Sequence, residues 1–415
     1  MKLRTFLTAL AATTLFLAMA VTAHAETTLN ALFMSQAAYS EADVKAMTAD
    51  FEAANPGLKV NLEFVPYEAL HDKIIAAKGA GDRGYDVVLF DVVWPAEFAK
   101  RGFLVDVTDR ISKEVEQQVF DGAWTTVSCN GQRYGMPWIL DTKYMFYNKD
   151  MLRKAGFSNP PKTWKELAEQ ATAIKAKGIV EYPIVWSWSQ SEAMICDYTT
   201  LVAAYGGKFF ENGKPAFNKG GALDAVTYMA ASLKDGLTNP SSREYLEEDV
   251  RRVFSNGEAA FAMNWTYMYN LANDPKESRV AGNVDVMPCP GVDGISTASG
   301  VNGSMGLGIT SNSVHQDEAW KFITFLTSQP VQNRYARLSL PIWKSSYSDP
   351  EVVKGQEALV KAASQGIAVM TPRPLVPSYT ELSNILQRYI HEALLGEATP
   401  ADAMDKAAKR AARLR

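Results

Sequence analysis

The sequence is poor in the residues that build metal and redox centres. It contains four histidines and three cysteines, Cys129, Cys196 and Cys289, and no two cysteines form a C-x-x-C pair. A zinc knuckle or a dithiol centre needs closely spaced ligands, and no two histidines stand at a spacing such as H-x-x-x-H. We therefore expect no metal and no cofactor. One disulfide is possible in an exported protein, and the sequence does not say which cysteines would form it.

The chain also has no basic block outside its C-terminal end. It carries 42 Lys and Arg against 46 Asp and Glu, a formal net charge of −4. Nucleic-acid binding depends on clustered basic residues. Those of the last predicted helix, at residues 400–413, alternate with alanines, as is typical of a solvated helix face. We expect no nucleic-acid partner.

Long apolar runs are scarce as well. The longest, at residues 5–21, follows Lys2 and Arg4 and leads to an Ala-His-Ala end at residues 23–25. A basic start, a short apolar core and a small-residue end are the three parts of a secretory signal, whereas a membrane span needs about 20 apolar residues. We expect cleavage after Ala25 and a soluble periplasmic protein; the alternative is an uncleaved anchor. The remaining length suggests two lobes.

Helix and strand patterns alternate from residue 40 onward. Ser40 predicts the start of a helix, and period-two apolar residues predict a strand at 58–64. A helix at 67–80 and a buried strand at 87–90 then complete a strand–helix–strand unit, which implies a parallel sheet. Asn130-Gly131 predicts a hairpin, and Thr163 with Glu166 predicts a capped helix. Further helices are expected at 316–328, 351–364 and 378–395, and further strands at 182–188, 284–288 and 305–310.

Eight segments of the chain carry a family resemblance. In chain order they are FEAANPGLKVNLEFV, YDVVLFDVVWPAEFAKRGFLVDVTD, YGMPWILDTKYMFYNKDMLRKAGF, PKTWKEL, NGEAAFAMNWTYMY, VDVMPCPG, LPIWKSSYSDPEV and TPRPLVPSYTELSNILQRYIHEALLGEATPADAM. They resemble the family 1 extracellular solute-binding proteins, and most closely the trehalose- and maltose-type binding proteins of bacterial sugar importers. The similarity spans nearly the whole chain after the signal.

The resemblance implies an α/β, two-lobed periplasmic-binding-protein fold of type II. Crossing strands would join the lobes and allow hinge closure on a ligand in the cleft between them. We expect these crossings near residues 136–140, 287–291 and 340–343. The implied division is a signal peptide at 1–25, an N-terminal lobe at 26–138 plus 290–341, and a C-terminal lobe at 139–289 plus 342–415.

Two aspartates and one arginine are the polar candidates for the ligand site. Asp91 directly follows the strand at 87–90, at the sheet edge where such folds bind ligands, and a carboxylate accepts strong hydrogen bonds from hydroxyls. The resemblance matches both Asp91 and Asp141 to ligand-binding aspartates; the alternatives are a helix N-cap for Asp91 and a surface pair with Lys143 for Asp141. Arg373, between two prolines, could donate to a sugar hydroxyl and neutralise an aspartate, or be an ordinary loop arginine.

Aromatic rings are the second kind of candidate, because the apolar face of a sugar ring packs flat on them. Trp265 is the first choice, with a core position as its alternative. Gln36 lies in a loop that would help to discriminate among sugars, and the Gly-rich residues 300–309 would let the backbone approach a ligand closely. The weaker aromatic candidates are Trp94, Trp138, Trp186, Trp188, Tyr267 and Trp343.

Together these features predict a non-enzymatic, monomeric receptor. It would capture a sugar by lobe closure and deliver it to the permease subunits of an ABC importer. One alternative keeps the fold and changes the cargo to a polyamine or a polyol. The other is a secreted glycosidase with Asp91 and Asp141 as its acid and base, although Arg373 beside them would oppose the protonated acid that hydrolysis needs. The sequence leaves the identity of the sugar open.

Overall fold

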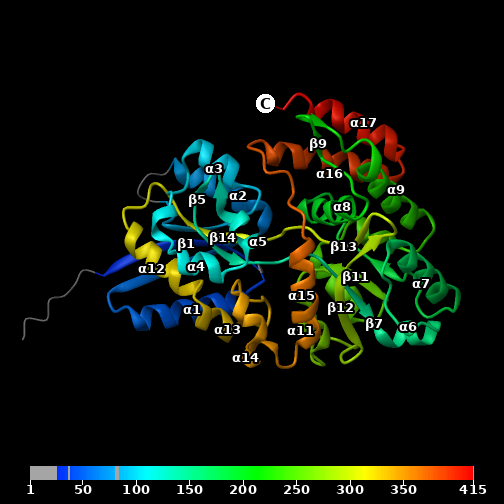
Figure 1. Cartoon of the computed structure of the whole chain (residues 1–415), viewed down its shortest axis with the longest axis horizontal. Helices are drawn as coiled ribbons and strands as arrows, with labels where there is room; N and C mark the ends of the chain where they lie inside the picture. The colour runs from blue at the N-terminus through cyan, green and yellow to red at the C-terminus, as the bar shows by residue number, and fades with distance from the viewer. Residues whose placement is uncertain (1–25, 36–37, 80–83, 415) are drawn as a thin grey trace, which may run out of the picture.

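The computed structural model describes residues 26–35, 38–79 and 84–414. It contains two five-stranded sheets, each with its own covering of helices, which form two lobes side by side (Figure 1). The mixed α/β class predicted from the alternating patterns is confirmed. The expected signal segment and the candidate Gln36 lie outside the described residues.

The first lobe is built on a sheet with the strand order β2-β1-β3-β14-β6. The strands β1, β2 and β3 are parallel, as the strand–helix–strand pattern predicts, and β14 pairs antiparallel with both β3 and β6. All five residues of β3 are buried, which explains its unbroken apolar run. The strand bounds are β1 Thr27–Met34, β2 Leu58–Val65, β3 Val87–Asp91, β6 Met136–Ile139 and β14 Met305–Ile309.

The second lobe is built on a sheet with the order β13-β12-β7-β11-β8. Its central strand, β7, pairs antiparallel with both β12 and β11. Two small hairpins, β4–β5 and β9–β10, lie outside the two sheets. The bounds are β7 Tyr144–Asn148, β8 Ile184–Val185, β11 Phe261–Asn264, β12 Val284–Val292 and β13 Ser296–Ser299, with β4 Ser128–Cys129, β5 Gln132–Arg133, β9 Phe210–Glu211 and β10 Lys214–Pro215 in the hairpins.

Helices cover both sheets (Figure 1). The α-helices are α1 Glu41–Ala54, α2 Tyr67–Lys78, α3 Pro95–Arg101, α4 Lys113–Gln118, α5 Asp121–Trp124, α6 Lys149–Ala155, α7 Trp164–Ala176, α8 Glu192–Ala204, α9 Gly220–Lys234, α10 Glu247–Ser255, α11 Met268–Asn273, α12 Gln316–Leu326, α13 Gln329–Arg334, α14 Pro350–Val353, α15 Glu357–Val369, α16 Tyr379–Leu395 and α17 Pro400–Ala411.

The capping and turn signals of the sequence are confirmed. The Ser40 side chain accepts a hydrogen bond from the backbone N–H of Asp43, 3.1 Å away, and so caps α1. Thr163 caps α7 in the same way. Asn130 and Gly131 have φ of 53° and 81°, the two positive values that a tight hairpin turn requires.

Two of the expected elements differ from those observed. The helix expected at 351–364 is split into α14 and α15, because Gly355 between them has φ of 82° and interrupts the helical path. The strand expected at 182–188 is reduced to β8, since only Ile184 and Val185 pair with β11. Further along that segment, the backbone N–H of Trp188 donates a hydrogen bond to the backbone carbonyl of Ser242 instead of to a neighbouring strand.

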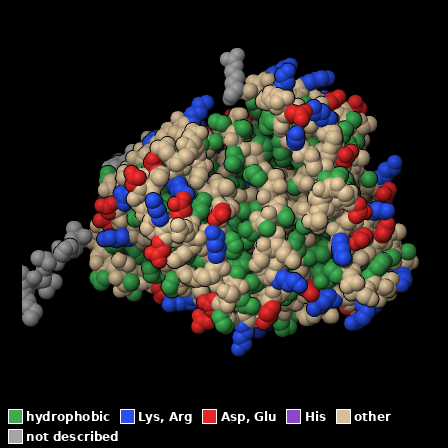
Figure 2. All heavy atoms as spheres, in the orientation of Figure 1, with side chains coloured by type: hydrophobic (Ala, Val, Ile, Leu, Met, Phe, Trp, Pro, Cys, Tyr) green, Lys and Arg blue, Asp and Glu red, His purple; other side chains and the backbone are tan. Residues whose placement is uncertain are grey.

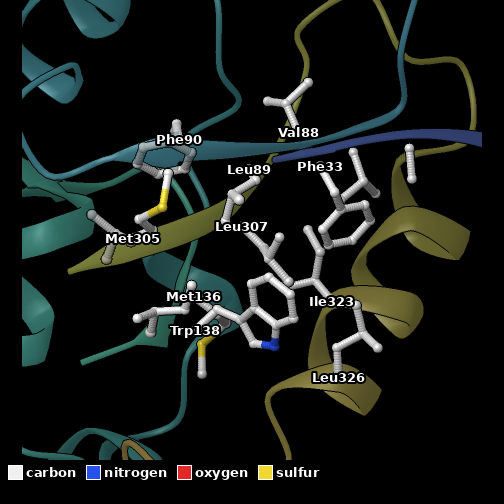
Figure 3. Packing of buried hydrophobic residues seen from close by; sticks show 14 of the residues in the cluster. Phe33, Val88, Leu89, Phe90, Met136, Trp138, Met305, Leu307, Ile323 and Leu326 are labelled. Atoms are coloured by element: carbon white, nitrogen blue, oxygen red, sulfur yellow. The ribbon is translucent and has the colours of Figure 1, made fainter. Parts of the chain in front are cut away.

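Each lobe has its own hydrophobic core. In the first lobe, side chains of β1, β3, β6 and β14 pack against α12, with Trp138 and Leu307 near the centre of the group (Figure 3). In the second lobe, one cluster covers each face of the sheet, because alternate residues of β7 and β11 point to opposite sides. The lobes are therefore separate packing units.

Crossing segments join the lobes. The chain passes between the sheets at residues 140–143 and 300–304, and residues 370–378 run beside these two segments. The three are hydrogen-bonded to one another, through Gly303 N to Asp141 O at 3.1 Å and Thr371 N to Gly300 O at 2.8 Å. The three segments therefore form one hydrogen-bonded strip between the two sheets.

One expected crossing lies elsewhere. Residues 287–291 are inside β12, which pairs with β7 and then with β13, so the β12–β13 hairpin keeps the chain in the second sheet until residue 299. The segment at 340–343 lies at the border between the lobes: Leu340 belongs to a core cluster of the second lobe, whereas Ile342 and Trp343 belong to the core of the first.

The surface carries charges of both signs. In Figure 2, Lys and Arg side chains are interspersed with Asp and Glu around the outline of the molecule, and apolar side chains gather toward its middle. None of the helices in the described part of the chain has the length and apolar character needed to cross a membrane.

Candidate functional site

A cavity of about 310 Å³ lies between the lobes. Its wall combines residues of the first lobe, of the second lobe and of the crossing segments, so lobe movement would change its shape. Apolar and polar side chains share this wall, as is usual for small-molecule sites. The polar and aromatic residues that line it are Ser35, Tyr67, Glu68, Asp91, Asp141, Glu192, Glu247, Glu248, Trp265, Tyr267 and Arg373.

Asp91 ends β3 and faces this cavity from the first lobe. One carboxylate oxygen accepts from the Val93 N–H at 3.1 Å and from Nη2 of Arg373 at 2.6 Å, and the other accepts from the Tyr67 hydroxyl at 3.1 Å. The alternative of a helix N-cap does not hold, because α3 begins after Trp94 and has no side-chain cap. The carboxyl edge of the parallel strands therefore presents Asp91 to the cavity, as the sheet rule predicts.

Arg373 reaches the cavity from residues 370–378, which connect α15 to α16 and run beside the two crossing segments. It is only 1% exposed, and its two Nη groups are divided between carboxylates of the two lobes: Nη2 contacts Asp91, and Nη1 contacts Oε1 of Glu192 at 2.6 Å. Its guanidinium also lies 5.8 Å from the ring centroid of Tyr379. The expected neutralisation of an aspartate is thus present, together with a second carboxylate that sequence reasoning did not anticipate.

Asp141 lies in the first crossing segment and is buried at the cavity wall. Its oxygens accept from the Thr142 N–H at 2.9 Å and from the backbone and hydroxyl of Thr266. Burial raises the pKa of this carboxyl from 3.8 to about 7. The alternative pairing with Lys143 does not occur, because the Lys143 ammonium contacts Asp197 at 3.1 Å and Glu247 at 3.4 Å instead.

Trp265 follows β11 and is held from three sides. Its indole N–H donates to Oε1 of Glu247 at 3.2 Å, and the ammonium of Lys143 lies 4.6 Å from its ring centroid. Gly303 of the second crossing packs against its six-membered ring. The ring is partly exposed and lines the cavity, so it presents an aromatic surface in a fixed position.

Tyr267 also lines this wall, and its hydroxyl is buried without a hydrogen-bond partner in the described part of the chain. Burial, together with the nearby carboxylates of Glu248 and Glu247, raises the pKa of Tyr267 well above its ordinary value. The phenol therefore stays protonated and can donate a hydrogen bond. Glu248 is paired with Nε of Arg251 at 2.9 Å.

The structure does not bring the other tryptophan candidates to the cavity. Trp94 is buried against Tyr67 and Phe98, Trp188 stacks on Trp186 with ring centroids 4.8 Å apart, and the Trp343 N–H donates to the Thr327 carbonyl at 2.9 Å. Trp138 and Trp186 are core residues of the first and second lobe. These side chains contribute to packing.

Sequence reasoning missed several lining residues, among them Tyr67, Glu192, Glu247 and Glu248. Tyr67 could have been found, because it opens the helix after β2 at the same sheet edge as Asp91. The three glutamates stand in the first turns of α8 and α10, where acidic residues are common for helix-dipole reasons alone. Nothing in their local sequence distinguishes a cavity residue from a solvated one.

The structure provides no evident metal or redox chemistry at this site. In residues 26–35, 38–79 and 84–414, no three His, Cys, Asp or Glu side chains are grouped so that they could hold a metal ion. The possible disulfide is not formed, because Cys129, Cys196 and Cys289 are all free thiols. Cys129 lies in β4, whereas Cys196 and Cys289 are buried in α8 and β12.

Comparison with known proteins gives a consistent result. The sequence profile of the bacterial extracellular solute-binding proteins matches residues 35–333. A probable ABC transporter-binding protein of Deinococcus radiodurans is 28% identical over 374 residues, covering 86% of each chain. The maltose-bound MalE3 structure of T. maritima is 32% identical, with a TM-score of 0.85 over 92% of this chain and 98% of that one. A Thermotoga lettingae solute-binding protein bound to α-D-tagatose is 26% identical, with a TM-score of 0.81 over 92% and 98%.

Proposed function

This chain belongs to the family of bacterial extracellular solute-binding proteins, and from that premise we propose that it captures a neutral sugar for an ABC importer. The family resemblance of the eight segments is confirmed, as is the two-lobed periplasmic-binding-protein fold. The sugar, its capture by lobe closure and its delivery to permease subunits are the steps that we propose. The proposal includes a periplasmic location, which agrees with the extracellular character of the family.

The observation that carries the proposal is the joint presence of Asp91, Asp141 and Trp265 on one cavity wall. The two carboxylates offer acceptors to sugar hydroxyls, and the indole ring offers a flat apolar surface to the C–H face of a sugar ring. The cavity is at the small end of the roughly 300–1,000 Å³ found for small-molecule sites. Its size favours a monosaccharide or a disaccharide over a longer chain.

The balance of charges favours a neutral ligand. Asp91 and Glu192 share Arg373, Glu247 is paired with Lys143, and Glu248 is paired with Arg251. Because these carboxylates already have cationic partners, the ligand does not need to supply a full positive charge. An anionic ligand would meet carboxylate oxygens on several sides, which costs electrostatic free energy. Uronic acids and sugar phosphates should therefore be excluded.

The second candidate is a cationic ligand such as a polyamine. It is favoured by the number of carboxylates in the wall and opposed by the guanidinium of Arg373, which is part of the same wall. It should therefore be part of any ligand screen.

A thermal-shift screen tests the proposal. The purified protein is melted with maltose, trehalose, glucose, mannitol, glucuronate or spermidine, because a ligand that binds only the folded state raises the melting temperature. We expect at least one neutral sugar to raise it, and glucuronate to have no effect. A shift with spermidine alone, or no shift with any neutral sugar, would contradict the proposal. In a separate assay, release of free glucose from maltose would indicate a hydrolase.

Tryptophan fluorescence gives a second, site-specific measurement. The chain has nine tryptophans, and seven of them are buried; Trp265 and Trp320 are the exceptions. Trp320 lies in α12 and does not line the cavity, so a sugar-dependent change in emission should come chiefly from Trp265.

A further inference from the structure

Glu192 has no assigned role, yet it is one of the most fully bonded carboxylates in the cavity wall. It is the first residue of α8 in the second lobe, and its side chain is 12% exposed. Oε1 accepts from Nη1 of Arg373 at 2.6 Å and from the hydroxyl of Tyr379, and Oε2 accepts from the hydroxyl of Ser383. Tyr379 and Ser383 belong to α16, so Glu192 holds Arg373 against two helices of the second lobe.

The same arginine is also held by the first lobe. Nη2 of Arg373 contacts Oδ1 of Asp91 at 2.6 Å, and the Asp91 side chain is 6% exposed. Asp91 is in turn fixed by the Val93 N–H and the Tyr67 hydroxyl. A continuous chain of charges, Asp91–Arg373–Glu192, therefore links β3 of one lobe to α8 of the other through a residue of the α15–α16 connection.

We propose that Glu192 is a positioning residue that acts through Arg373 to set how readily the lobes close. Arg373 can remain within 2.6 Å of both carboxylates only while β3 and α8 stay close together. Separation of the lobes would break the ion pair between Arg373 and Asp91, so the closed arrangement keeps an electrostatic attraction that the separated one lacks. The charge chain thus favours the closed arrangement before any ligand contributes contacts of its own.

This role has a consequence for ligand affinity, which rests on the proposed function. If only the closed arrangement binds tightly, the apparent affinity scales with the fraction of molecules that are closed. Asp91 is a proposed ligand contact, and Glu192 is linked to it only through Arg373. A substitution at Glu192 should therefore change the ligand affinity through the closed fraction. The effect should also be visible in the protein without a ligand.

The central variant is Glu192→Gln, which keeps the size of the side chain and removes its charge. We expect small-angle scattering of the free protein to give a larger radius of gyration than for the unmodified chain. Titration with maltose, followed by calorimetry, should give a Kd about tenfold higher, within the range typical of coupling between a conformational equilibrium and binding. Arg373→Lys should enlarge the free protein in the same way, because an ammonium group lacks the planar fork that bridges two carboxylates.

Two controls separate positioning from simple loss of structure. Ser383→Ala removes a hydroxyl from Glu192 and leaves its ion pair with Arg373 in place, so it should lower the melting temperature slightly without enlarging the free protein. In a double-mutant cycle with Asp91→Asn, the effects of Glu192→Gln and Asp91→Asn on the radius of gyration should not add, because both act through the same arginine.

An unchanged radius of gyration in a folded Glu192→Gln protein would overturn the inference, and so would fully additive effects in the cycle. If Glu192→Gln does not fold, the radius of gyration of the free Arg373→Lys protein decides: an unchanged value overturns the inference, and a larger value supports it. If the scattering changes as expected and no neutral sugar binds, the charge chain stands and the proposed sugar function fails.

Discussion

Gly303 lies directly against the six-membered ring of Trp265: a Cβ atom at position 303 would come within 2.2 Å of Cη2 and 2.3 Å of Cζ3. Gly303 belongs to the second crossing segment, whereas Trp265 follows β11 of the second lobe. The position of the aromatic surface in the cavity is therefore set by the hinge as well as by its own lobe. A shift of either would displace the ring.

Gly303→Ala should move Trp265 away from its place in the cavity. The backbone of Gly303 does not have a positive φ, so the expected effect comes from the added methyl group alone. Overpacking of this kind costs about 1–3 kcal/mol in the free energy of unfolding. We expect lower stability by urea unfolding and a weaker Kd for maltose. Gly79→Ala is the matched control, because a Cβ there meets its nearest atom at an ordinary 3.5 Å; equal results for both variants would refute the prediction.

Trp265 and Trp188 should respond differently to the same substitution. Trp265→Leu removes the ring that lines the cavity, so we expect loss of the fluorescence response to maltose and a large loss of affinity, with a modest change in stability. Trp188→Leu removes a fully buried ring that stacks on Trp186 and leaves a smaller cavity than a Trp→Ala truncation would, so we expect a loss of up to about 3 kcal/mol of stability with little change in Kd. Calorimetric titration and urea unfolding of the two variants measure both quantities. A large loss of affinity in Trp188→Leu, with unchanged affinity in Trp265→Leu, would show that the ligand binds elsewhere.

The pH dependence of stability should report on Asp141. Its pKa is about 7 in the folded protein, mainly because of burial, and about 3.9 in an unfolded chain. Between these values the folded state holds a proton that the unfolded state has lost, so the free energy of unfolding decreases as the pH rises from about 4 to about 7. Asp141→Asn removes this contribution. Urea unfolding at pH 5 and pH 8 should show a smaller loss of stability in the variant than in the unmodified chain, and an equal loss would contradict the assignment.

Lys143 should be essential for stability although it lies beside the cavity. Its side chain is fully buried, and its ion pair with Asp197 and Glu247 raises the pKa of Lys143 above its ordinary value. Lys143→Met would leave Asp197 buried without a cation, at a cost of about 3–5 kcal/mol. Lys45→Met is the control, because Lys45 and Glu41 form an exposed pair worth about 0.3–0.5 kcal/mol at most. Similar unfolding free energies for the two variants would argue against the buried pair.

The sequence allowed part of this site to be anticipated. Asp91 could be placed at the carboxyl edge of a parallel sheet because the apolar run before it predicted a buried strand. Asp141 and Arg373 came from the family resemblance, and the structure places both at the cavity with Asp91. Local signals also predicted the cap of α1 and the turn at Asn130-Gly131, since capping and turn conformation depend on residues next to each other in the chain.

What the sequence alone determined was therefore the order of most helices and strands and the residues that end a buried strand, because these depend on short-range periodicity and backbone preference. The family came from the resemblance of whole segments to known proteins. Only the tertiary structure decided which tryptophan faces the cavity, since Trp188 and Trp265 differ in their distant neighbours and not in their local pattern. It also decided where the chain crosses between lobes, because the pairing of β12 with β13 extends the second sheet. The Asp91–Arg373–Glu192 chain joins residues up to 282 positions apart, and such contacts arise only when two separately packed lobes meet.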